Sequence, residues 1–115
     1  MEQVKWKRID TNRHYKCLSK IYNVELIFES REKKIYTVKN KPHCQVYEAR
    51  LVVFSDGCAI MFVNYTSYSG VKEKHNFYYD KNGIEIKYET DAEEKRTFEE
   101  ITGKCVSTAL RGNEK

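Results

Sequence analysis

Residues 46–63, VYEARLVVFSDGCAIMFV, form the longest run of strand-forming residues in the chain. Asp56-Gly57 near its centre is typical of a tight hairpin turn, because such turns need positive φ angles. We expect two antiparallel strands in which Ser55 faces Cys58. In this register one side carries Leu51, Val53, Ile60 and Phe62, and the other carries Arg50, Val52, Phe54, Ala59, Met61 and Val63.

Both sides of this hairpin are apolar near the turn, whereas a hairpin with one side in water alternates apolar and polar residues. The hairpin is therefore expected to be covered on both sides. A central pair of strands in a barrel, with side chains filling the interior and another element packed outside, fits that requirement.

The remaining segments add more strands and one helix. Alternation predicts strands over 14–29, with Tyr22 on the core side, and over 34–39, with Tyr36. A second hairpin joins 74–79 to 84–89, with Tyr79 facing Ile84 and Phe77 facing Ile86. A helix is expected from a cap at Asp91, supported by Glu94, to Gly103, with Phe98 and Ile101 on its apolar stripe. An extended segment, 105–110, follows it.

The length indicates a single domain over residues 1–115, and the strand and helix patterns indicate an all-β antiparallel barrel with one short C-terminal helix. The chain contains no run of about 18 apolar residues, which is the length that a membrane helix needs. The net charge of +4 is mixed along the chain, which favours a solvated surface over nucleic-acid binding. The first ten residues lack the apolar core of a signal peptide. A secreted origin would therefore require that the signal peptide has already been removed and that Met1 has been added to the mature chain.

Four cysteines, Cys17, Cys44, Cys58 and Cys105, are spread over the chain without a CxxC pair. This spacing favours two disulfides in an oxidising compartment over buried thiols, with three possible connectivities. Asn64-Tyr65-Thr66 is an acceptor triplet for N-glycosylation, which is compatible with secretion.

No catalytic or metal-binding pattern is present in the sequence. The three histidines have no ligand spacing, and there is no phosphate loop, nucleophile elbow or paired acid and base. We therefore expect a protein without enzymatic activity, metal or cofactor.

Nine tyrosines and five phenylalanines can fill a core or line a cavity. Trp6 either closes one end of the barrel or contacts a ligand. Arg50 is the charged residue of interest, because a guanidinium facing the interior needs an anionic partner. That partner is either Glu48, two residues earlier on the same side, or the carboxylate of a ligand. The candidate ligand-binding residues are Trp6, Tyr22, Tyr36, Arg50, Val52, Phe54, Met61 and Phe77.

LVVFSDGCAIMFV resembles the central hairpin of the tick salivary lipocalins, the group that includes histamine-binding proteins. Trp6-Lys7 followed by HYKCLSKIYN resembles that family's opening turn and first barrel strand, and Phe98 to Cys105 resembles its C-terminal helix and disulfide. The resemblance covers most of the chain in the right order. It implies a secreted lipocalin-like barrel, monomeric, that sequesters a host mediator and so assists immune evasion.

The chain also departs from that family. Its barrels have eight strands, whereas about seven are expected here, and the general lipocalin Gly-x-Trp motif is absent. The family's usual partner for the cysteine matched by Cys58 has no counterpart. Amine-binding members place acids at the positions of Arg50 and Asn76, so an anionic lipid such as a fatty acid or eicosanoid is expected instead of an amine.

Two other functions stay open from the sequence. A barrel filled by its own tyrosines would act as an inhibitor of a host immune or haemostatic protein, meeting it through the 65–71 loop with Tyr65 and Tyr68. Seven strands followed by a helix also describe an intracellular pleckstrin-like module, which would bind phosphoinositides through Lys and Arg.

Overall fold

The computed structural model describes residues 2–7, 19–42 and 44–111. Within these ranges the chain forms seven strands, one α-helix and one 3₁₀ turn. The elements are β1 (Glu2–Lys7), β2 (Ser19–Glu29), β3 (Lys33–Val38), β4 (Val46–Phe54), β5 (Ala59–Thr66), β6 (Lys72–Tyr79), β7 (Glu85–Ile86), α1 (Asp91–Thr102) and η1 (Val106–Thr108). The predicted mostly-β fold with one short helix is confirmed.

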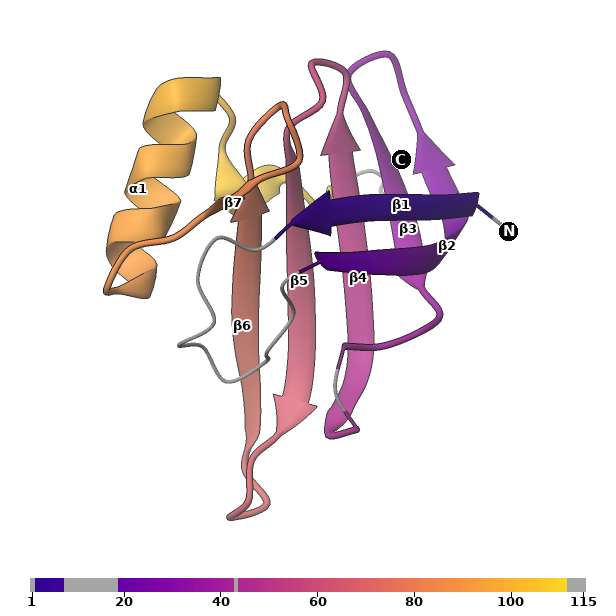
Figure 1. Ribbon diagram of the computed structural model, residues 1–115, viewed down its shortest axis with the longest axis vertical. Coiled ribbons are helices and arrows are strands. Elements are labelled where there is room, and N and C mark those ends of the chain that lie inside the picture. The colour runs from indigo at the N-terminus through magenta and orange to yellow at the C-terminus, as the bar shows by residue number, and fades with distance from the viewer. Residues whose placement is uncertain (1, 8–18, 43, 112–115) are drawn as a thin grey trace.

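The seven strands form one antiparallel sheet whose spatial order follows the chain, β1 to β7. The sheet curls into a half-barrel, in which β1 and the start of β2 cross in front of β4 and the end of β1 reaches β5 (Figure 1). Among the described strands the barrel is not closed, because β1 and β7 are the two edges and do not pair.

The central hairpin differs from its predicted register by one residue. Leu51 faces Met61 and Val52 faces Ile60. The turn has three residues, Ser55 to Gly57, closed by a hydrogen bond from the Phe54 N–H to the Cys58 carbonyl at 2.9 Å. Gly57 ends this turn with a φ of 99°, a conformation that glycine adopts at little cost.

The same three-residue turn recurs in the next two hairpins. Gly70 joins β5 to β6 at a φ of 85°, and Gly83 joins β6 to β7 at 81°. In the second of these, the Asp80 N–H donates to the Ile84 carbonyl at 3.0 Å, so Tyr79 faces Glu85 and not Ile84. The predicted register of this hairpin is therefore also wrong by one residue.

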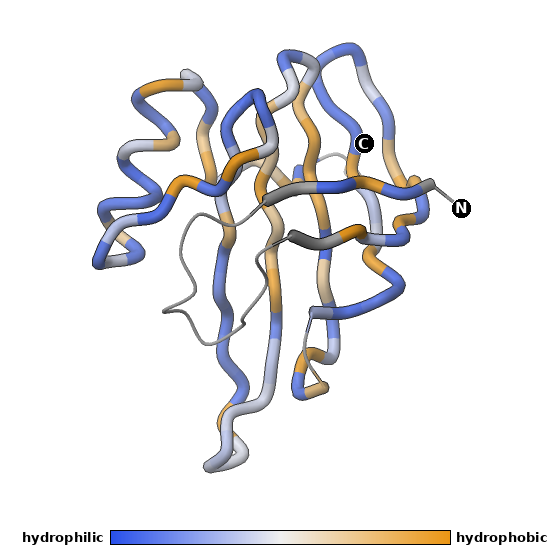
Figure 2. The backbone as a smooth tube through the Cα atoms, in the orientation of Figure 1, coloured by the Kyte–Doolittle hydropathy of each residue, from blue (hydrophilic) through white to orange (hydrophobic). Residues whose placement is uncertain are grey.

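The correct registers sort the apolar residues onto two faces. The inner face of the half-barrel buries Tyr22, Val24, Tyr36, Val38, Val46, Ala49, Leu51, Ala59, Met61, Val63, Phe77 and Tyr79. The outer face buries Ile35, Val52, Phe54, Cys58, Ile60, Tyr78 and Ile86 against residues of the C-terminal part, Phe98, Val106 and Ala109. Hydrophobic colouring is concentrated in the upper parts of β4 and β5, and the lower part of β6 is hydrophilic (Figure 2). The prediction that the central hairpin is covered on both sides is confirmed.

Helix α1 packs on the outer face and buries two side chains, Phe98 and Glu94. Phe98 is fully buried, and its ring centroid lies 5.3 Å from Tyr78 and 6.4 Å from Phe54. Ile101, predicted on the same stripe, is 61% exposed. The N-cap is Thr90 and not Asp91, because the Thr90 hydroxyl accepts from the Glu93 N–H at 3.1 Å.

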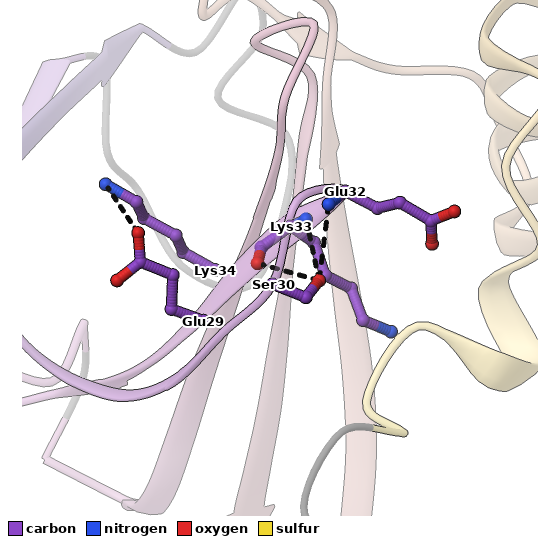
Figure 3. Close-up of polar contacts among 5 residues, drawn as sticks. All are labelled: Glu29, Ser30, Glu32, Lys33 and Lys34. Atoms are coloured by element: carbon purple, nitrogen blue, oxygen red, sulfur yellow. Dashed lines mark hydrogen bonds and ion pairs between the residues drawn. The ribbon is translucent and has the colours of Figure 1, made fainter.

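The segment after α1 is also held on the outer face, but as a 3₁₀ turn and not as the predicted extended segment. Lys33 reaches it from the start of β3, and its Nζ donates to the Ala109 carbonyl at 2.7 Å and the Thr108 carbonyl at 3.3 Å. Figure 3 shows the β2–β3 turn that positions this lysine, with the Ser30 hydroxyl accepting from the Lys33 N–H. Desolvation lowers the pKa of Lys33.

Candidate functional site

The predicted ligand-binding residues lie on opposite faces of the sheet. Tyr22, Tyr36, Met61 and Phe77 belong to the inner face. Val52 and Phe54 belong to the outer face. Arg50 also lies there, because it alternates with inward-facing Ala49 and Leu51. Trp6 pairs with Lys20 in the β1–β2 ladder, and its side chain lies outside the described residues. The structure therefore separates Arg50 from the aromatic interior, since the one-residue shift in register moves Met61 to the other side.

Side chains fill the inner face at its centre. Leu51 and Met61 are fully buried, Phe77 is 2% exposed, and Tyr22 and Tyr36 are 3% and 4% exposed. Side chains packed to this extent occupy the space that a ligand body would need. These aromatic residues therefore act as core, which was one of the two interpretations that the sequence left open.

Arg50 has the structural partner that the sequence offered. Its Nη2 lies 3.0 Å from Oε2 of Glu48, and both side chains are partly exposed on the outer face. Glu48 Oε1 also accepts from Nδ2 of Asn64 at 3.0 Å. The predicted glycosylation residue, Asn64, thus lies in the paired strand β5 with its amide nitrogen already hydrogen-bonded, and not in a surface loop.

The two predicted partner-binding tyrosines have different environments. Tyr65 lies in β5 and packs against the inner core, and its hydroxyl donates to Oε1 of Glu73 at 2.7 Å. This hydrogen bond, followed by burial, raises the pKa of Tyr65. Tyr68 lies in the turn between β5 and β6 and is 87% exposed. Of the pair, only Tyr68 offers most of its side chain to a partner.

Exposed apolar side chains in and beside the β5–β6 hairpin were missed from the sequence. Tyr47 is 45% exposed and Val71 is 55% exposed, and the Lys72 ammonium lies 5.3 Å from the Tyr47 ring centroid. A β-bulge between Val46 and Glu48 places Tyr47 out of the strand alternation. The sequence feature that marks this bulge is the three-residue spacing between Val46 and Ala49, because both side chains are buried on the inner face.

Two of the four cysteines are free thiols in different surroundings. Cys58 is 1% exposed, and burial together with a hydrogen bond to the Asp56 carboxylate raises its pKa to about 12. Cys105 is exposed, and hydrogen bonds with Ser107 and Thr108 lower its pKa. Cys17 lies outside the described residues, and Cys44 is exposed. Two disulfides would need all four cysteines, and the structure holds Cys58 in the outer core and Cys105 at the surface as separate thiols, so the two-disulfide prediction has no support among the described residues.

No group of three His, Cys, Asp or Glu side chains comes together in a way that could hold a metal ion in the described part of the chain. Over the same residues, no helix combines the length and apolar character needed to cross a membrane.

Comparison with known proteins found no matching family model, no matching curated protein and no matching solved structure.

Proposed function

We propose that this protein is a non-enzymatic binding protein that meets a protein partner through the tip of the β5–β6 hairpin. The tip surface consists of Tyr47, Tyr68, Val71 and Lys72. The observation that carries the proposal is Tyr68, a large aromatic side chain that is 87% exposed. Tyrosine is a frequent anchor in protein interfaces, because it buries a large ring and has few rotatable bonds to fix.

The hairpin presents Tyr68 on an ordered turn that projects beyond the other strand connections (Figure 1). Backbone hydrogen bonds from Ser67 to the Val71 carbonyl and from Gly70 to the Ser67 carbonyl, both 2.9 Å, close the turn. The Ser67 hydroxyl also accepts from the Val71 N–H at 3.2 Å. A turn ordered before binding loses little conformational entropy when a partner docks.

The charges around the tip surface indicate the chemistry of the partner. Lys72 and Lys41 are exposed at its border, next to the apolar groups Tyr47 and Val71. An apolar centre with a basic border matches a protein surface that has an apolar pocket and acidic side chains around it. The resemblance to the salivary lipocalins favours a host immune or haemostatic protein as this partner.

The other predicted function, capture of an anionic lipid in the interior, has less support. It needed Arg50 beside the inner aromatics, and Arg50 lies on the outer face, bound to Glu48. The seven-stranded meander followed by a helix on its outer face supports the proposal that this half-barrel is a shortened lipocalin-type fold. Secretion and the monomeric state rest on the resemblance alone.

The test is partner capture with matched tyrosine variants. Wild-type protein, Tyr68→Ala and Tyr88→Ala are immobilised and exposed to plasma proteins, and captured proteins are quantified by mass spectrometry and then measured individually. Tyr88 is 49% exposed on the segment before α1, so its variant removes the same side chain elsewhere. Loss of an anchor of about 2 kcal/mol weakens Kd about 30-fold.

We expect one captured protein to weaken with Tyr68→Ala and to bind Tyr88→Ala as it binds wild type. Equal capture by all three proteins, with equal thermal stability, would remove the tip surface as the binding site.

A further inference from the structure

The turn between β6 and β7 contains Asn82 followed by Gly83, a pair of residues with its own chemistry. An asparagine side chain reacts with the backbone nitrogen of the next residue, because the five-membered ring that forms has little strain. A following glycine favours this reaction, since it has no Cβ to block the approach and its backbone adopts many conformations. Asn82-Gly83 is the only asparagine–glycine pair in the sequence.

Asn82 lies at a water-exposed corner of the fold. It is exposed, and it lines a cavity of about 260 Å³ together with Asp56 of the β4–β5 turn and Thr102 at the end of α1. This corner is at the end of β6 opposite the tip surface (Figure 1). The two turns are in close contact, because a Cβ added at Gly57 would lie 3.0 Å from the Lys81 carbonyl oxygen. A change at Asn82 therefore acts on both turns.

Hydrogen bonds to Asp80 hold the β6–β7 turn closed. Oδ1 of Asp80 accepts from the Asn82 N–H at 2.8 Å and from the Ile84 N–H at 3.1 Å. The Asp80 carbonyl accepts from the Gly83 N–H at 3.0 Å. The Gly83 nitrogen is the atom that reacts, so the turn must open before Asn82 can be modified.

The turn can open while the rest of the sheet stays paired. The β6–β7 ladder has two pairs, Tyr78 with Ile86 and Tyr79 with Glu85, whereas the β5–β6 ladder on the other side of β6 has eight. Segments with few hydrogen bonds and exposed turns open locally at a fraction of the free energy of global unfolding. The reactive conformation is therefore reached from the native protein.

We propose that Asn82 is a site of spontaneous deamidation in the folded protein, and that Asp80 controls its rate. The Gly83 nitrogen gives its proton to water and forms a bond to Cγ of Asn82, the Cγ–Nδ2 bond breaks, and Nδ2 takes up a proton from water and leaves as ammonia. Water then opens the succinimide ring at either carbonyl, which leaves aspartate or isoaspartate at position 82. The site uses none of the tip surface, so it is independent of the proposed protein-binding function.

Both products weaken the packing of the two turns. Each adds a negative charge to a cavity that Asp56 and Asp80 already line. Isoaspartate also adds one carbon to the backbone of a tight turn whose hydrogen bonds require the present length. The modified protein should therefore unfold at a lower urea concentration than the unmodified protein.

The test follows the full native chain during incubation in neutral buffer at physiological temperature. Peptide mass spectrometry measures conversion at each asparagine, and isoaspartyl methyltransferase with S-adenosylmethionine labels the isoaspartate. We expect position 82 to convert at least about tenfold faster than Asn64 and Asn76, which lie in paired strands and precede large side chains. Equal rates at the three asparagines, or conversion at position 82 in urea but not in the native protein, would overturn the proposal.

Three single substitutions assign the roles of the two side chains. Asn82→Gln lengthens the reacting side chain by one carbon, so ring closure becomes much slower and the label at position 82 should disappear. Asp80→Ala removes the acceptor oxygen and should speed conversion about fivefold, the factor expected for the loss of one hydrogen bond. Asp80→Asn keeps an acceptor at Oδ1 and should convert at nearly the wild-type rate.

Asn82→Gln alters an exposed side chain and tests the site even if Asp80→Ala fails to fold. Labelling at position 82 that persists in Asn82→Gln would refute the site. A wild-type rate in a folded Asp80→Ala, or equal acceleration in Asp80→Ala and Asp80→Asn, would refute the control by the Asp80 hydrogen bonds.

Discussion

The buried thiol of Cys58 should make the stability of this protein fall in mildly alkaline solution. Its pKa rises from 9.0 to about 12 on folding, mainly because the side chain is buried. The folded protein therefore holds this proton more tightly than the unfolded chain does. The stabilisation from Cys58 is complete below pH 9 and is lost as the pH rises toward 12.

The magnitude follows from proton linkage. Between these two pKa values, the free energy of unfolding falls by about 1.4 kcal/mol per pH unit. From pH 8 to pH 10.5 the loss from Cys58 is about 2 kcal/mol. This is a large part of the stability of a small domain, which is typically about 5 to 15 kcal/mol.

Urea unfolding at several pH values, followed by circular dichroism, measures this loss. Lysines and tyrosines also titrate in this range, so wild type is compared with Cys58→Ala, and only the difference in pH dependence is assigned to the thiol. We expect the variant to lose about 2 kcal/mol less between pH 8 and pH 10.5. Parallel pH profiles of the two proteins would refute the argument, and would be the result if Cys58 were in a disulfide or open to solvent.

Three further comparisons between variants test the packing, the helix cap and the turns by chemical denaturation. Phe98→Ala should cost about 3 to 5 kcal/mol, because this fully buried ring joins α1 to the sheet, whereas Ile101→Ala, at a 61% exposed position, should change stability by less than about 0.5 kcal/mol. Thr90→Ala should cost about 1 kcal/mol by removing the N-cap, and Thr90→Ser should restore most of it. Gly70→Ala should cost about 1 kcal/mol of stability, because Gly70 has a positive φ and nothing lies within 4 Å of an added Cβ. Gly57→Ala should cost clearly more, because an added Cβ there lies 3.0 Å from the Lys81 carbonyl oxygen. Equal losses in the two variants would contradict this reasoning.

Sequence patterns located the strands well and their registers poorly, for a physical reason. Asp56-Gly57 suits a two-residue turn with two positive φ angles, and it equally suits the last two positions of a three-residue turn in which only Gly57 has positive φ. Alternation normally decides between such registers, since a slip of one residue exchanges the faces. Here both faces are apolar, so burial favoured neither register.

The one-residue error in register also made the predicted ligand-binding site wrong. With the predicted register, Arg50 shared a face with Met61; with the observed one, Arg50 faces Phe62 across the ladder and Met61 faces Leu51. The Arg50–Glu48 ion pair was nevertheless predictable, because residues two apart on a strand share a face in either register. The position of the C-terminal segment on the outer face was not predictable, because it is a contact between distant parts of the chain.

The order of the strands has a consequence for how the chain folds. Every ladder in the sheet joins strands that are neighbours in sequence, so no pairing has to bring together distant parts of the chain. The docking of the C-terminal segment is different, since the Lys33 contacts to Thr108 and Ala109 span 75 and 76 residues. We therefore expect the meander to assemble first, hairpin by hairpin, and the C-terminal segment to close over its outer face as a separate, later step.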